Sequence, residues 1–108
     1  MATIEKGRTL MTLVNVFIVK PDKQAELVEV LVQATDETMK HLPGFISASI
    51  HRSLDGTRVI NYAQWRSKAD FEALKDNPRA MPHMKAAAKL ASFEPIVCEV
   101  AESIGVDS

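Results

Sequence analysis

The chain has 108 residues, of which 46% are hydrophobic and 25% are charged, an ordinary composition for one soluble globular domain. Its 13 basic and 14 acidic residues give a net charge of -1, without any block of like charge. This balance argues against nucleic acid or an anionic membrane as a partner. No apolar run approaches the ~20 residues of a membrane span. We therefore expect a single cytoplasmic domain over residues 1–108, with loose tails at 1–8 and 103–108.

The first predicted element is a strand over residues 9–20 that is apolar at both alternating sets of positions. A strand of this kind is a central one, covered on both faces. Asn15 is the one amide inside it. Pro21 ends the strand, and Asp22 is expected to cap the helix that follows.

That helix is predicted to end near Lys40. Apolar and small residues recur along it at helical spacing, at Leu27, Leu31, Ala34 and Thr38. Leu-Pro-Gly at 42–44 stops the helix, because the residue before a proline avoids helical geometry and glycine permits a turn.

A β-hairpin is predicted over residues 45–53 and 57–66, joined at Asp55-Gly56. Residues two and four apart on a strand point to the same face, so Asn61 and Trp65 share one wall. An amide buried in an apolar wall costs free energy unless something hydrogen-bonds to it. Asn61 is therefore a candidate for binding or chemistry.

Two registers of this hairpin place His51 differently. A two-residue turn sets His51 opposite Ile60, on the face away from Asn61. A three-residue loop with Gly56 left-handed instead sets His51 on the face of Asn61 and Trp65. The same register brings three further residues to that face: Phe45, Ser47 and Ser49.

Two short helices and a last strand follow the hairpin. Ser67 resembles the start of a capping box that opens the first helix, and Pro82 suits the first turn of the second. Asn-Pro at 77–78 separates them. A strand over residues 93–100 completes the fold, and its Pro95 indicates a sheet edge or the start of a strand.

The predicted order is β-α-β-β-α-β, the ferredoxin-like arrangement of the α+β class, with a four-stranded antiparallel sheet whose first and third strands are central. Helices cover only one face of such a sheet, yet both faces of the central strands are apolar or aromatic. A second copy of the chain, packed sheet against sheet, is the expected cover.

Residue types that hold metals or phosphates are not arranged to do so. The single cysteine, Cys98, lies in an apolar run and is expected to be a buried structural thiol. The chain has no paired cysteines and no His-Glu-x-x-His sequence, and its glycines are scattered. We expect no metal site and no phosphate-binding loop.

With this order of elements, three segments resemble the antibiotic biosynthesis monooxygenase family: Leu-Val-Asn-Val-Phe at 13–17, Pro-Gly-Phe at 43–45 and Asn-Tyr-Ala-Gln-Trp at 61–65. The resemblance covers about residues 9–101. It implies a dimeric α/β barrel with an apolar pocket between the sheet and the helices of each subunit. The pattern is most similar to members that oxidise polyketide anthrones to quinones without a cofactor.

The resemblance also implies catalytic residues. Those members combine an asparagine on the first strand with an asparagine and a tryptophan on the third, which correspond to Asn15, Asn61 and Trp65. Family members carry histidines where His51 and His83 stand, and both are candidate proton acceptors. The resemblance favours the register that places His51 beside Asn61.

Four further residues are candidates for substrate binding: Phe45, Ser49, Arg79 and Met84. Phe45 would stack on the substrate's rings, Arg79 would steer an anionic substrate, and Met84 would line an adaptable wall. Simpler interpretations stand beside these, since an exposed loop arginine and a gap-filling methionine are both common.

The function implied is that of a small homodimeric monooxygenase that uses O2 to oxidise a polycyclic phenolic or anthrone-like substrate to a quinone, without a cofactor. Two alternatives stand beside it. A haem-binding, haem-degrading monooxygenase would use His83 as iron ligand, although Leu74 stands where those members have a tryptophan. A dimeric module that binds or isomerises a small metabolite would use the same pocket.

Overall fold

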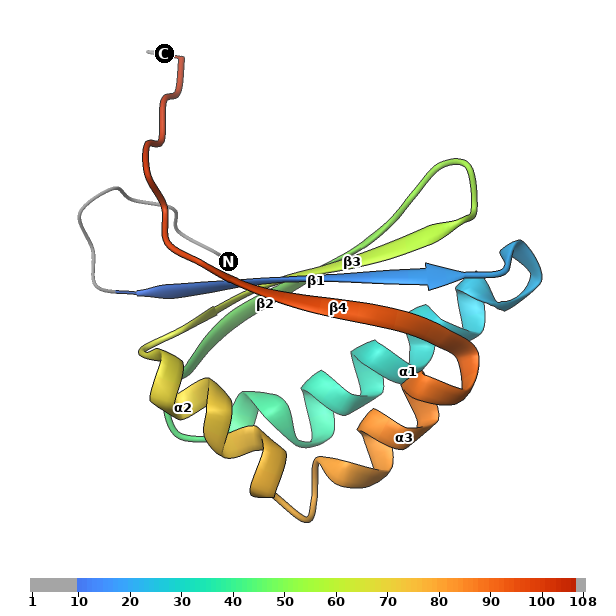
Figure 1. Ribbon diagram of the computed structural model, residues 1–108, viewed down its shortest axis with the longest axis horizontal. Helices are drawn as coiled ribbons and strands as arrows, with labels where there is room; N and C mark the ends of the chain where they lie inside the picture. The colour runs from blue at the N-terminus through green and yellow to red at the C-terminus, as the bar shows by residue number, and fades with distance from the viewer. Residues whose placement is uncertain (1–9, 107–108) are drawn as a thin grey trace.

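The computed structural model describes residues 10–106 and has the predicted α+β order (Figure 1). The expected arm at 1–8 and the end of the expected tail, 107–108, lie outside the described residues; residues 103–106 form neither helix nor strand. No helix in the described range is long and apolar enough to cross a membrane. The elements are β1 (Met11–Val19), η1 (Pro21–Lys23), α1 (Gln24–Glu37), η2 (Met39–His41), β2 (Phe45–Arg52), β3 (Arg58–Trp65), α2 (Lys68–Glu72), η3 (Ala73–Asp76), α3 (Met81–Leu90) and β4 (Ala91–Cys98), where η marks a 3-10 turn.

The strands form one antiparallel sheet in the order β2-β3-β1-β4, so β1 and β3 are central as predicted. The helices α1, α2 and α3 all lie on the same side of this sheet (Figure 1). The core between the two layers has one cluster around Phe17 and Leu27 and another around Leu13 and Trp65. The predicted buried stripe is present, with Leu27, Leu31 and Ala34 on α1 and Thr38 directly after it. The helix ends at Glu37, three residues before the predicted end near Lys40.

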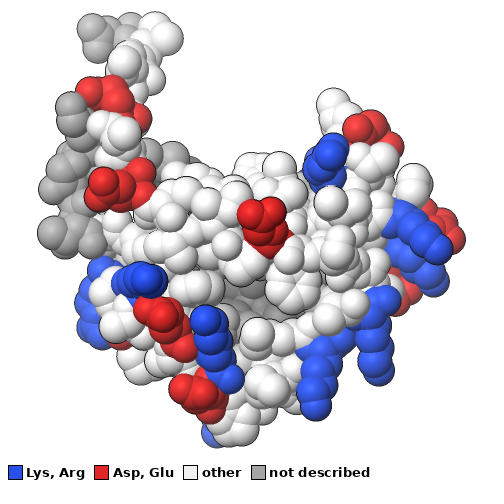
Figure 2. Space-filling model, viewed as in Figure 1, with Lys and Arg blue, Asp and Glu red and all other residues white. Residues whose placement is uncertain are grey.

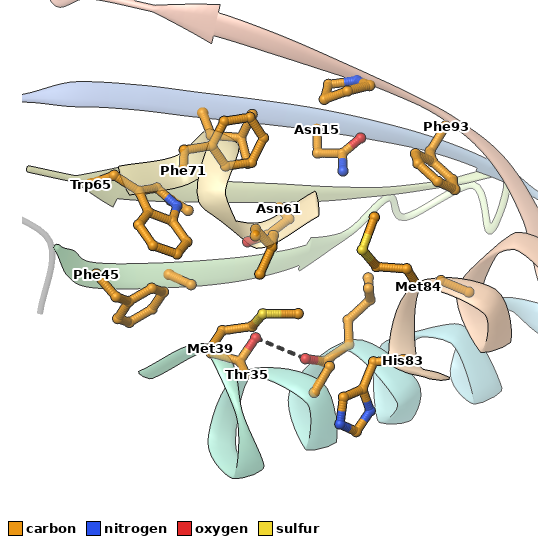
Figure 3. A pocket seen from close by; sticks show the side chains of 18 of the residues that line it. Asn15, Thr35, Met39, Phe45, Asn61, Trp65, Phe71, His83, Met84 and Phe93 are labelled. Atoms are coloured by element: carbon orange, nitrogen blue, oxygen red, sulfur yellow. Dashed lines mark hydrogen bonds between the residues drawn. The ribbon is translucent and has the colours of Figure 1, made fainter. Parts of the chain in front are cut away.

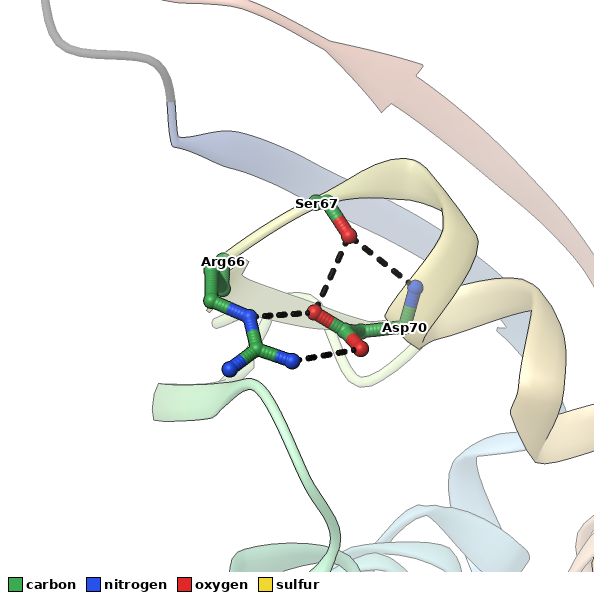
Figure 4. A network of polar contacts seen from close by, with 3 residues as sticks. All are labelled: Arg66, Ser67 and Asp70. Atoms are coloured by element: carbon green, nitrogen blue, oxygen red, sulfur yellow. Dashed lines mark hydrogen bonds and ion pairs between the residues drawn. The ribbon is translucent and has the colours of Figure 1, made fainter.

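The helix starts agree with prediction at α2 and differ at α1. Asp22 does not cap α1, because Pro21 already begins the 3-10 turn η1 ahead of it. At α2, Ser67 is the N-cap as predicted, and its Oγ accepts a hydrogen bond from the Asp70 amide N–H at 3.2 Å; the Asp70 carboxylate accepts from the Ser67 hydroxyl at 2.9 Å. The Asp70 carboxylate also accepts two hydrogen bonds from Arg66, of 2.8 and 2.9 Å, and so ties the end of β3 to α2 (Figure 4).

The last strand begins two residues earlier than predicted. Helix α3 passes directly into β4 at Ala91. Within the described residues β4 pairs with β1 alone, and this edge position accommodates Pro95 as predicted. Cys98, which was expected to be buried, is only partly buried at the end of the strand.

The β2–β3 hairpin adopts the register in which His51 lies opposite Ile60, so the register that the family resemblance favours is wrong. A β-bulge at the start of β2 shifts the pairing by one residue, and Phe45 thereby still lies opposite Trp65. Three residues expected beside Asn61 instead point to the sheet face without helices: Ser47, Ser49 and His51.

The loop between β2 and β3 explains this register. The Ser53 amide N–H donates to the Arg58 carbonyl at 3.0 Å, so four residues connect the strands rather than three. Asp55 Oδ1 accepts hydrogen bonds from the Thr57 amide and from the hydroxyls of Ser53 and Thr57, at 2.7 to 3.0 Å. Gly56 is left-handed, with φ of 80°, although that conformation was expected only for the three-residue loop.

The sheet face away from the helices is apolar along its centre. Its central cross-strand pairs are Val14 with Tyr62 and Val16 with Ile60. Ile18 at the end of β1 is 58% exposed. Within residues 10–106 no helix packs on this face (Figure 1).

Candidate active site

A pocket of about 280 Å³ lies between the sheet and the helices. Figure 2 shows the molecule hollowed between β4 and helices α2 and α3. The volume is near the lower limit of ligand pockets, which is about 300 Å³. Most lining residues are apolar, and the polar ones are few: Asn15, Thr35, Asn61, Lys75 and His83.

Asn15 and Asn61 lie directly opposite each other on β1 and β3, and both line the pocket. Figure 3 shows Asn15 projecting from its strand into the pocket. The Oδ1 atom of each amide is buried and has no hydrogen-bond partner among residues 10–106. Buried polar atoms in folded proteins are nearly always paired. Two adjacent unpaired acceptors in an apolar wall are an arrangement that a ligand with O–H or N–H donors would complete.

Trp65 and two phenylalanines form one end of the pocket (Figure 3). The Trp65 ring is 2% exposed and meets Phe45 edge to face, with ring centroids 5.3 Å apart. Its centroid lies 6.0 Å from that of Phe71. These contacts fix the indole and create a rigid aromatic wall that suits a flat ring system.

His83 lines the pocket from the first turn of α3 and is held by the end of α1. Its Nε2 lies 3.2 Å from Thr38 Oγ1, and Thr38 is itself buried. This hydrogen bond fixes the imidazole and uses one of its two ring nitrogens. Met84, the next residue on α3, contributes a sulfur-containing side chain to the wall (Figure 3).

The structure brings together most of the predicted site residues. Those that line the pocket are Asn15, Phe45, Asn61, Trp65, His83 and Met84. Ser49 and His51 lie on the other sheet face because of the hairpin register. Arg79 is exposed in the loop before α3 and is absent from the pocket lining.

Other wall residues were not predicted as part of a site. Phe71, Leu74 and Lys75 line the pocket from α2 and η3. Their spacing of three and four residues places them on one helical face, and that spacing is the signal that could have found them. Thr35 and Met39 similarly follow the buried Leu31 at intervals of four.

This fold and this pocket define a class of enzyme. The chain belongs to the antibiotic biosynthesis monooxygenase family, whose model matches residues 10–90. The protein is a monooxygenase with a ferredoxin-like α+β fold, as predicted.

Individual relatives give the comparison more detail. Tetracenomycin-F1 monooxygenase of Streptomyces glaucescens is 51% identical over 108 residues, which span 100% of this chain and 96% of the relative. A monooxygenase from the gene ActVA-Orf6 of Streptomyces coelicolor, solved with the ligand nanaomycin D, is 29% identical with a TM-score of 0.86, covering 98% of this chain and 100% of that one. SnoaB, a cofactor-independent oxygenase from Streptomyces nogalater, shares the fold at 24% identity with a TM-score of 0.78, covering 89% and 97%.

Proposed function

We propose that the protein uses O2 to oxidise a polycyclic phenolic or anthrone-like substrate to a quinone, without a cofactor. The observation that carries this proposal is the pair of unpartnered amide oxygens of Asn15 and Asn61 in a pocket with an aromatic wall. A hydroxylated fused-ring compound would bury its rings against Trp65, and its O–H groups would donate to the two amide oxygens that have no partner. The 51% identical relative is named for tetracenomycin F1, and its name agrees with this substrate class.

In the proposed reaction the substrate supplies the electrons. Loss of a proton from the CH2 group, which lies across the central ring from the carbonyl and is conjugated with it through the aromatic rings, gives a delocalised carbanion that passes one electron to O2. The resulting radical pair combines to a peroxide. The O–O bond then breaks with loss of water, so one CH2 and one O2 give one quinone C=O and one H2O.

The pocket residues have separate roles in this scheme. The side-chain N–H groups of Asn15 and Asn61 stabilise the oxyanion that forms with the carbanion, and their oxygens accept the substrate's hydroxyl groups. An amide is not basic, so the proton goes to another group. His83 is the histidine that lines the pocket, and we assign it this role; Thr38 holds its ring in place.

The haem-degrading alternative does not fit the residues at the pocket. The hydrogen bond between His83 Nε2 and Thr38 Oγ1 leaves Nδ1 as the one ring nitrogen available to a ligand, so the feature that disfavours haem is the residue at the tryptophan position. Leu74 lines the pocket where haem degraders have a tryptophan. The metabolite-binding alternative, which lacks oxygen chemistry, is disfavoured by the chain's membership of a monooxygenase family.

We also propose that two copies pack their sheets against each other. The support is the apolar sheet face that none of the described helices covers, together with the 42% exposed Ile96 and 58% exposed Ile18 on it. Burial of this face would stabilise a small domain that has only one helical layer. The cytoplasmic location expected from the sequence remains a prediction.

Oxygen uptake tests the proposed reaction. Purified protein is mixed with dithranol, a model anthrone, without added cofactor, reductant or metal and with a chelator present. We expect uptake above the rate without protein, one O2 per quinone formed, and no effect of the chelator. Absence of uptake with dithranol and with a series of other hydroxylated anthrones would contradict the proposal.

A further inference from the structure

Lys75 differs from every other residue that lines the pocket. It is the one Lys, Arg, Asp or Glu in the lining, and it comes from η3, across the pocket from the sheet strands that carry Asn15 and Asn61. Lys75 is exposed, so its ammonium stands at the rim and not on the floor. In the described part of the chain it has no ion-pair partner.

The neighbours of Lys75 explain why a cation there can serve a ligand. Phe71 and Leu74 share its helical face and are apolar, so the lysine stem extends that wall while the ammonium stays in water. The acidic residues nearest in sequence, Glu72 and Asp76, are exposed and do not line the pocket. Basic and acidic side chains both border the hollow in Figure 2, so Lys75 is distinguished by lining the pocket and not by the charge of the surrounding surface.

We propose that Lys75 binds a carboxylate on an outer ring of the substrate, away from the central ring that reacts. This inference rests on the proposed function, because it assumes a fused-ring substrate in this pocket. The ion pair would fix the direction in which the rings enter. The carbonyl whose oxygen gains charge when the CH2 group is deprotonated then faces the amides of Asn15 and Asn61, and the carboxylate stays at the solvent-exposed rim. Lys75 is thus a specificity-determining residue that selects acidic substrates.

Two substrates that differ in one group test this role. Rhein anthrone carries a carboxylate where chrysophanol anthrone carries a methyl group. We expect Lys75→Met to raise the KM for rhein anthrone about fivefold, as for a partly screened ion pair. The kcat for both substrates and the KM for chrysophanol anthrone should stay unchanged. Lys75→Arg should restore most of the lost preference, and Lys89→Met, which removes an exposed lysine of α3 outside the pocket, should change nothing.

A binding measurement separates this inference from the proposed reaction. Trp65 is the only tryptophan of the chain and lies in the pocket, so its fluorescence reports binding of the product quinones rhein and chrysophanol without turnover. We expect the parent to prefer rhein, the preference to weaken with added salt, and Lys75→Met to abolish it. If the protein shows this preference but consumes no oxygen, the proposed reaction fails and the role of Lys75 stands. Equal binding of the two quinones by the parent, or equal weakening of both by Lys75→Met, would overturn it.

Discussion

Asn15 and Asn61 illustrate how a binding site costs a protein stability. Each holds a buried amide oxygen without a partner among residues 10–106. An unsatisfied buried acceptor costs about 1–3 kcal/mol, so the protein without a ligand is less stable than it would be with an apolar pocket of the same shape. A ligand hydroxyl that pairs with these oxygens recovers this free energy. The same two unpaired oxygens that lower the stability of the free protein therefore favour substrate binding.

Replacement of Asn61 by alanine separates a catalytic role from a structural one. We expect Asn61→Ala to lower kcat about a hundredfold, the usual loss when one oxyanion donor is removed. The melting temperature should not fall with it, because the substitution removes an unpaired buried group. Oxygen uptake and thermal unfolding measure the two effects.

Gln33→Ala is the matched control, since it removes an exposed amide of α1 outside the pocket. Its rate should equal that of the parent. A parental rate in Asn61→Ala, or a rate that falls only together with the melting temperature, would remove Asn61 from the mechanism.

Trp65 offers a second test at the same scale. In Trp65→Phe an aromatic ring remains between Phe45 and Phe71, but the indole N–H and part of the flat surface are lost. We expect kcat/KM for dithranol to fall about fivefold, the effect of a lost aromatic contact. Phe45→Leu removes the edge-to-face partner and keeps the indole N–H, so comparison of the two variants assigns the loss to hydrogen bonding or to packing. Full activity in both would exclude this wall from substrate binding.

At the scale of elements, much of the fold follows from local sequence signals. The continuous apolar run of the first strand, the helical stripe ending at Thr38, and the breakers Pro43 and Gly44 mark the first strand and the first helix to within three residues of their observed ends. The amides of Asn15 and Asn61 were also recognisable, because polar residues are rare in apolar strands. Each of these signals depends only on residues close in sequence.

The register of the hairpin could not be predicted in the same way. It depends on three side-chain hydrogen bonds to Asp55 that lengthen the loop, and on a bulge near Phe45 that changes which residues face the helices. Neither feature has a unique sequence signal. The position of Lys75 on the pocket wall depends on how η3 packs against the sheet, which local spacing alone does not determine.

The Asp55 loop makes the stability of the hairpin depend on pH. Hydrogen bonds from Thr57 and Ser53 lower the pKa of Asp55 from 3.8 to about 2. A carboxylate with a lowered pKa in the folded state stabilises the fold above the pKa of the unfolded chain, about 3.9, and this contribution is lost as the pH falls towards 2. We therefore expect Asp55→Ala to lower the free energy of unfolding at pH 7, with a difference from the parent that shrinks between about pH 4 and pH 2.

Asp55→Asn is the matched comparison, because its amide oxygen still accepts hydrogen bonds without titrating. It should lie between the parent and the alanine variant at pH 7. Urea unfolding at several pH values gives these free energies. A difference between parent and Asp55→Ala that stays constant from pH 7 to pH 2 would show that the charge of Asp55 does not stabilise the loop.

At the scale of the whole molecule, the two faces of the sheet have different roles. One face supplies the pocket, and its strands carry Asn15, Asn61 and Trp65 towards the helices. The other face carries Val14, Val16 and their neighbours, which have no catalytic chemistry. Successive residues of β1 and β3 thus face the pocket and the proposed dimer interface in turn. A substitution on one face therefore leaves the side chains of the other face in place.

Val16→Arg tests the dimer directly. Val16 lies at the centre of the uncovered face, opposite Ile60 on β3 and Glu94 on β4. In a sheet-to-sheet dimer each variant subunit would bury an arginine against its copy near the interface centre, which costs several kcal/mol. We expect the parent to sediment as a dimer at micromolar concentration and Val16→Arg as a monomer.

Val32→Arg, on the exposed face of α1, introduces the same charge away from the sheet and should remain dimeric. A monomeric parent, or a dimeric Val16→Arg, would exclude this face as the interface. Because Val16 points away from the pocket, any loss of oxygen uptake in a folded Val16→Arg monomer would further show that the pocket needs the partner subunit to work.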